Sequence, residues 1–149
     1  MSYLARETLI SALINGAISV TFFLGVFGRS DPVTVWGIGN FAFDFLPQSF
    51  AVGFMATLVP GLLCRRWMLS GGNRAASLIR PTVGSVFSRA LLHGFAAVGA
   101  GVALCSLALW LSGVHTIPNA PAFVLKVAYG AALGAVVTWI TLRRMLASA

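Results

Sequence analysis

The chain has 149 residues, of which 58% are hydrophobic and only 9% are charged, and its formal net charge is +7. A soluble domain carries about a quarter charged residues, so this composition cannot cover a water-facing surface and excludes a soluble fold. We expect an all-α integral membrane protein, a single transmembrane domain over residues 1–149 in which four helices form two helical hairpins in a compact bundle.

Four uncharged, apolar runs are long enough to be membrane spans, because about 20 such residues cross a hydrocarbon layer roughly 30 Å thick. The expected spans lie at about residues 8–27, 45–63, 86–114 and 122–142. A loop over about residues 64–85 joins the second span to the third. Pro118 marks the turn before the fourth span, because proline interrupts a helix.

The distribution of basic residues predicts the orientation of these spans. Eight of the ten lie on one side of the expected bundle: Arg6, Arg65, Arg66, Arg74, Arg80, Arg89, Arg143 and Arg144. The positive-inside rule therefore places both termini and the middle loop in the cytoplasm. We expect a protein of the bacterial inner membrane whose cytoplasmic face contacts anionic lipids. Arginines that flank apolar segments, without an aromatic-interleaved polar surface, argue against nucleic-acid binding.

The two halves of the chain end alike, with Arg65 and Arg66 after the second span and Arg143 and Arg144 after the fourth. Aligning these endings places Gln48 opposite Lys126 and raises the hypothesis of a duplicated two-span hairpin in parallel orientation. The positive-inside rule alone also accounts for the paired arginines, so both explanations stay open.

Small residues recur four positions apart in the last two spans. The pairs are Ala97 with Gly101 and Gly130 with Gly134. Such spacing lets helix backbones approach closely, and close packing drives association inside a membrane. We expect these residues to pack helices together, either within one bundle or against a second subunit.

Asp44 stands immediately before the second span and is the first candidate for a functional carboxylate. A structural interpretation is that it caps the first turn of that span and pairs with Lys126, with Gln48 one turn further on bonding to either. A functional interpretation is that the three residues form a cation or proton site near the outer edge of the membrane. We favour the structural interpretation because these positions lie near the interface.

A stripe of polar side chains follows the first span at every fourth residue, which places them on one face of a helix. The stripe consists of Glu7, Ser11, Asn15 and Ser19. Arg89 and His93 begin the third span one turn apart, and we expect them to reach Glu7. The stripe is either a set of bonds between helices or the inner part of an ion or proton path.

His93 is also a candidate ligand for a haem or chlorin, because the small residues beside it, among them Gly94 and Ala97, could leave room for a flat ring. The other histidine, His115, lies at the opposite face and cannot supply a second axial ligand within one subunit. We expect a hydrogen-bonded histidine and no cofactor.

Pro60 lies inside the second span and removes the hydrogen bond to the carbonyl of Ala56, so it is a candidate hinge. The sequence contains no nucleophile with a base, no phosphate-binding loop and no cluster of metal ligands, so we expect neither an enzyme nor a metal site.

We expect a non-catalytic small polytopic protein that acts through contacts between helices, as an accessory or assembly subunit of a larger membrane complex or as a homo-oligomer. The alternative is a small transporter or channel with a polar route through the outer cluster (Asp44, Gln48, Lys126) and an inner cluster (Glu7, Asn15, His93). Continuity of polar side chains distinguishes the two. The last two spans offer so few that we expect the route to be interrupted.

Overall fold

The computed structural model describes residues 3–29, 31–72 and 82–147. The helices are α1 (Tyr3–Phe27), α2 (Phe45–Trp67), α3 (Val83–Ser112) and α4 (Asn119–Ala147), and a short π-helix, η1 (Met68–Gly72), continues α2. The strands are β1 (Val33–Thr34) and β2 (Thr116–Ile117). All four α-helices are long and apolar enough to cross a membrane, which confirms the predicted all-α fold with four candidate spans.

The helix ends differ from the expected spans where local chemistry decides them. α3 ends at Ser112 because Gly113 adopts the left-handed conformation, with φ of 64°, which glycine reaches without steric cost. α2 and η1 together run to Gly72, so the loop expected from about residue 64 begins later than predicted. The middle of that loop, residues 73–81 with Arg74 and Arg80, lies outside the described residues.

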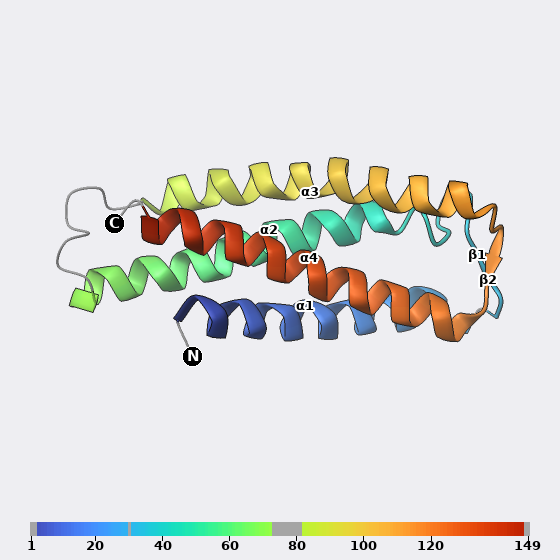
Figure 1. Ribbon diagram of the computed structural model, residues 1–149, viewed down its shortest axis with the longest axis horizontal. Helices are drawn as coiled ribbons and strands as arrows, with labels where there is room; N and C mark the ends of the chain where they lie inside the picture. The colour runs from blue at the N-terminus through green and yellow to red at the C-terminus, as the bar shows by residue number, and fades with distance from the viewer. Residues whose placement is uncertain (1–2, 30, 73–81, 148–149) are drawn as a thin grey trace.

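The helices do not pack as the two expected hairpins. α1 packs along α4, α3 packs along α2, and α2 and α4 meet in the middle, whereas α1 and α2 contact each other only loosely. The spatial order is therefore α1, α4, α2, α3, with α1 and α3 on opposite sides of the bundle (Figure 1). Small residues lie where the paired helices approach each other closely: Gly53 of α2 faces Ala97 of α3, and Gly16 of α1 faces Ala131 of α4.

This packing has the pattern that two related halves would produce. Exchanging the first hairpin for the second converts the α1–α4 contact into the α3–α2 contact and returns the central α2–α4 contact to itself. The antiparallel pairing of β1 with β2, one strand from each half, obeys the same exchange. The arrangement agrees with a duplicated hairpin, which stays a hypothesis.

One end of the bundle, which we call the β-pair end, is closed by the strands and an aromatic cluster. Val33 pairs with Ile117 across the two strands, and the cluster beneath them includes Phe23, Phe27 and Phe41, all nearly inaccessible. The opposite end, the termini end, carries the first and last described residues (Figure 1). The loop between α1 and α2 therefore pairs with the loop between α3 and α4, and this pairing holds the two halves of the chain together at the β-pair end.

Candidate functional site

An ion pair is buried inside the bundle, toward the β-pair end. The Lys126 ammonium donates to Asp44 Oδ2 at 2.9 Å, and the two side chains are 1% and 10% exposed. The ammonium also lies 3.8 Å from the centre of the Phe45 ring and 5.1 Å from that of Phe41. A carboxylate and two aromatic faces therefore replace the water that a buried cation loses.

The capping role expected of Asp44 is wrong. Asp44 has helical backbone angles, φ −68° and ψ −11°, and its side chain makes no capping hydrogen bond to α2. The carboxylate is used by Lys126, because a buried ammonium without a counter-charge would cost more than an uncapped helix turn. Asp31 instead accepts a hydrogen bond at a helix start, from the Asn119 backbone N–H of α4 at 3.2 Å.

Gln48 connects this ion pair to the polar stripe on α1. Its Nε2 donates to the Lys126 carbonyl oxygen at 3.2 Å and to Ser19 Oγ at 2.9 Å. Ser19 Oγ donates in turn to the Asn15 carbonyl oxygen at 2.8 Å. The outer cluster and the α1 stripe, which are separate features in the sequence, thus belong to one network across α1, α2 and α4.

The network continues toward the termini end through Ser11 and Thr138. Asn15 Nδ2 donates to the Ser11 carbonyl oxygen at 2.8 Å and to Ser11 Oγ at 3.1 Å. The Thr138 hydroxyl of α4 lies within donating distance of Ser11 Oγ, at 2.7 Å, and of the Ala56 carbonyl oxygen of α2, at 3.0 Å. Thr138 therefore joins the three helices at one level of the bundle.

Pro60 explains why Ala56 accepts a bond from another helix. A proline has no N–H, so Pro60 leaves the carbonyl oxygen of Ala56, four residues earlier, without its intrahelical donor. Thr138 of α4 supplies a donor at 3.0 Å. The proline thus produces an acceptor that ties α2 to α4, and its proposed role as a hinge stays a prediction.

His93 does not meet Glu7 as expected. It lies on α3, on the far side of the bundle from α1, and its Nδ1 is 2.9 Å from Thr57 Oγ1 and 3.5 Å from Thr141 Oγ1. Arg89 is exposed. The reason is the helix order, which places α4 and α2 between α1 and α3.

The slot expected beside His93 for a flat ring is filled. Gly94 faces the Phe50 ring of α2, and Ala97 faces Gly53. Within the described part of the chain, no group of three or more His, Cys, Asp or Glu side chains could hold a metal ion.

Together these bonded side chains form a polar column, running from the ion pair toward the termini end. The column comprises two hydrogen-bonded sets, and no hydrogen bond among the described residues joins them. The first set, linked in part through backbone carbonyls, consists of Asp44, Lys126, Gln48, Ser19, Asn15, Ser11 and Thr138, and the second consists of Thr57, Thr141 and His93. The interruption expected from the sequence stays a prediction, and the break between the two sets agrees with it. α3 contributes His93 to the second set, and α1, α2 and α4 contribute the other helical members.

The four small residues expected to pack helices lie inside this bundle. Ala97 faces Gly53, Gly101 faces the Tyr129 hydroxyl, and the remaining two face polar side chains of α1. These remaining two are Gly130, against Ser19, and Gly134, against Asn15. Their lack of bulk lets the polar column reach the backbone of α4.

Sequence reasoning missed several members of the polar column and its surroundings. Thr57 and Thr141 were not singled out, nor were Ser49 and Tyr129, whose hydroxyl oxygens lie 2.6 Å apart. One available signal was the recurrence of Ser49, Gly53 and Thr57 every four residues, which marks one face of the second span.

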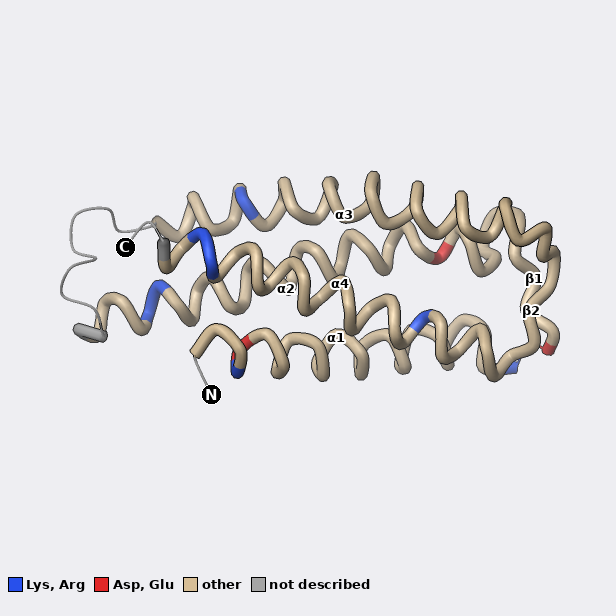
Figure 2. Tube along the Cα trace, viewed as in Figure 1, with Lys and Arg blue, Asp and Glu red and all other residues tan. Residues whose placement is uncertain are grey.

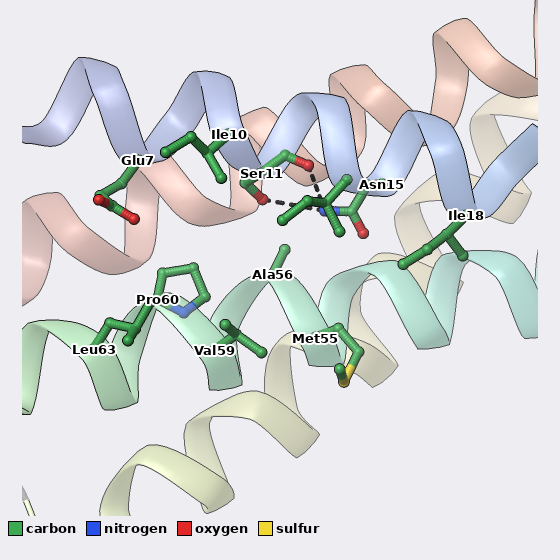
Figure 3. Close-up of a pocket in the computed structure, with 11 residues that line it drawn as sticks. Glu7, Ile10, Ser11, Asn15, Ile18, Met55, Ala56, Val59, Pro60 and Leu63 are labelled. Carbon is green, nitrogen blue, oxygen red and sulfur yellow. Dashed lines mark hydrogen bonds between the residues drawn. The ribbon is translucent and has the colours of Figure 1, made fainter.

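The loose contact between α1 and α2 leaves a groove of about 110 Å³ between them, the α1–α2 groove (Figure 3). Its walls are mostly apolar and include Ile10, Met55 and Val59. Glu7 lies at its termini end and Asn15 deeper along α1. A second groove, of about 760 Å³, lies between α3 and α4 and is lined mainly by apolar and aromatic side chains.

Comparison with known proteins adds no relative to this description. The chain matches no protein-family model, no curated protein and no solved structure.

Replacing Thr138 by valine is expected to destabilise the bundle by about 0.6–2 kcal/mol, in line with hydrogen bonds between membrane helices. The change leaves the Ala56 carbonyl and Ser11 without this donor. In a Pro60→Ala background the cost should shrink, because the new N–H at position 60 can donate to Ala56. Equilibrium unfolding in mixed micelles measures both effects.

Thr21→Val is the matched control for this experiment, because the exposed Thr21 hydroxyl donates to the Ala17 carbonyl of its own helix and to no other helix among the described residues. Its stability should change by less than about 0.5 kcal/mol. Equal losses in Thr138→Val and Thr21→Val would mean that the contact between helices contributes nothing.

Proposed function

We propose that this protein is a non-catalytic membrane protein that acts through lateral contacts between helices, as an accessory or assembly subunit of a larger membrane complex or as a homo-oligomer. The observation that carries this proposal is that the β-pair end of the bundle is packed with aromatic side chains, whereas its sides carry apolar grooves. Most polar side chains of the column bond to one another or to backbone carbonyls, and its buried side-chain oxygens without a partner among the described residues are Asn15 Oδ1 and Gln48 Oε1. Apolar grooves flank α1 and α3.

Closure of the column is what argues against a solute path. The Phe23, Phe27 and Phe41 side chains and the strand pair cover its β-pair end. A conducting route needs water or a mobile ion in contact with polar groups, and here those groups contact each other. Polar bonds of this kind between membrane helices are common packing interactions.

The charge distribution supports an orientation with the termini in the cytoplasm. Most of the basic positions drawn in blue in Figure 2 lie toward the termini end of the bundle. Lys126 is buried inside the bundle and pairs with Asp44. By the positive-inside rule the termini end faces the cytoplasm of a bacterial inner membrane, where it meets anionic lipids.

A second candidate function is a small transporter, and the buried Asp44–Lys126 ion pair with the polar side chains beside it favours this function. Ionisable residues inside a membrane commonly mark ion or proton paths. The route for this alternative would run past Glu7 and Asn15 in the α1–α2 groove and past Ser19 and Gln48 to the Asp44–Lys126 pair, once the aromatic cluster opened. On this alternative, the packed structure is one closed state of a working cycle.

Reconstitution into vesicles distinguishes the two candidates. We expect vesicles that contain the purified protein to dissipate imposed H⁺, Na⁺ and K⁺ gradients no faster than empty vesicles. The matched variant is Glu7→Gln, which removes the carboxylate nearest the termini end without changing its size. Flux above the empty vesicles that disappears in Glu7→Gln, while the thermal unfolding curve is unchanged, would establish the transporter instead.

A further inference from the structure

We propose that the α1–α2 groove is the docking site for one transmembrane helix of a different membrane protein. That helix would carry a lysine or arginine at the depth of Glu7 and a hydrogen-bond donor side chain at the depth of Asn15. The inference rests on the proposed function and names the kind of partner.

The first observation is an unpartnered oxygen in the groove. The Asn15 side chain is 3% exposed, and its Nδ2 is used by Ser11. Its Oδ1 has no hydrogen-bond donor among the described residues. In Figure 3 this oxygen points into the space between α1 and α2. A buried acceptor left unpaired is costly, and a donor that enters the groove would remove that cost.

The second observation is a carboxylate at the termini end of the same groove. The Glu7 side chain is only 11% exposed, and its described ion-pair partner, Arg6, is the neighbouring residue, whose own side chain is 62% exposed. Such an exposed pair is weak and can be exchanged. A cation approaching from the groove side would therefore find an acceptor that is already partly desolvated.

The spacing of these two groups points to a helix rather than a small molecule. Asn15 follows Glu7 by eight residues, which corresponds to about 12 Å along an α-helix. One headgroup cannot reach both, and an acyl chain offers Asn15 no donor. A membrane helix usually has a basic residue at its cytoplasmic end. A Ser, Thr, Asn, Gln or Trp two turns deeper would then meet Asn15, while its apolar side chains pack against Ile10, Met55 and Val59.

A second copy of this chain is a poorer fit. The partner helix needs a hydrogen-bond donor side chain eight residues deeper in the membrane than its basic residue. In α3 the residue at that distance from Arg89 is Ala97, and in α4 the residue at that distance from Arg143 is Ala135, so neither helix offers such a donor. Thr57 stands at this spacing from Arg65 of α2, but it is buried within the bundle. The described helices thus lack an exposed face with the required pair, and the occupant is a different protein.

The test uses a synthetic transmembrane peptide of leucine and alanine, with one lysine at its cytoplasmic end and one glutamine eight residues deeper. Energy transfer from the labelled peptide to the labelled full-length protein, in phosphatidylcholine and phosphatidylglycerol vesicles, measures association. We expect a peptide with leucine in place of glutamine to bind at least tenfold more weakly. Glu7→Gln in the protein should weaken the binding of the lysine peptide in the same direction.

Two matched tryptophan substitutions locate the site. Met55→Trp should fill the groove and weaken binding at least tenfold, whereas Leu104→Trp, on the exposed face of α3, should leave it within twofold. Thermal unfolding must be the same for both variants, and Val59→Trp replaces Met55→Trp if the latter is unstable. Equal binding of the two peptides would overturn the inference, and so would equal binding to the two variants. Energy transfer between labelled copies of the protein that Met55→Trp abolishes would also overturn it, because the groove would then hold a second copy.

These outcomes are separable from those of the proposed function. A peptide that fails to bind, with a stoichiometric partner still present in the native particle, refutes the groove and leaves the function standing. Ion flux that depends on Glu7, with glutamine-dependent peptide binding intact, refutes the function and leaves the groove as a helix site.

Discussion

Replacing Lys126 by methionine or Asp44 by asparagine is expected to destabilise the bundle by about 3–5 kcal/mol, because each change leaves one buried group without its partner. The double variant should cost much less than the sum of the two single variants, since it leaves no unpaired charge. A double-mutant cycle of unfolding free energies in mixed micelles measures the coupling. Additive losses would show that the pair does not act as a unit.

The exposed pair of Arg6 and Glu7 is the internal control for this cycle. Its two side chains are 62% and 11% exposed, and its atoms lie 3.0 Å apart, almost as close as those of the buried pair. Exposed pairs contribute about 0–1 kcal/mol because solvent screens them. Glu7→Gln should change stability far less than Asp44→Asn, because it leaves a solvated arginine without its partner, whereas Asp44→Asn leaves a buried lysine. The two carboxylates themselves are about equally exposed.

Alanine at position 53 is expected to destabilise the bundle by about 1–3 kcal/mol, because there is no room for a methyl group where α2 crosses α3. An added Cβ would lie 2.7 Å from Ala97 Cβ and 2.8 Å from the His93 carbonyl oxygen. The second of these atoms is backbone and cannot move aside without shifting α3. Equilibrium unfolding of Gly53→Ala measures the loss.

Gly99→Ala is the matched control on the opposing helix, because a Cβ there would meet no atom within 4 Å. Its stability should be unchanged or raised by up to about 1 kcal/mol, given the higher helix propensity of alanine. Similar losses at positions 53 and 99 would contradict the packing of α2 on α3.

The class of protein was predictable because it depends on composition and run length alone. Four apolar runs gave the four helices, and the isolated charges Asp44 and Lys126 had to find one another because a lone charge inside a membrane is costly. The four-residue spacing of Ser11, Asn15 and Ser19 likewise predicts that they share one polar face of the first helix.

The order of the helices was not predictable in the same way. Short outer turns suggested that consecutive helices pair, whereas contacts such as Gly53 with Ala97 and Gly16 with Ala131 select α2 with α3 and α1 with α4. This choice among helix faces decides what the polar side chains meet. It separates His93 from Glu7 and lets α4 complete the column.

The proposed function requires the bundle to act through lateral contacts in the membrane. Its most direct test is to extract the protein from its native membrane in polymer nanodiscs, and to determine the mass and protein composition of the particle that carries it. We expect a fixed stoichiometry with another membrane-protein chain or with further copies of this one. A particle that contains one copy of the chain and only lipid would contradict it.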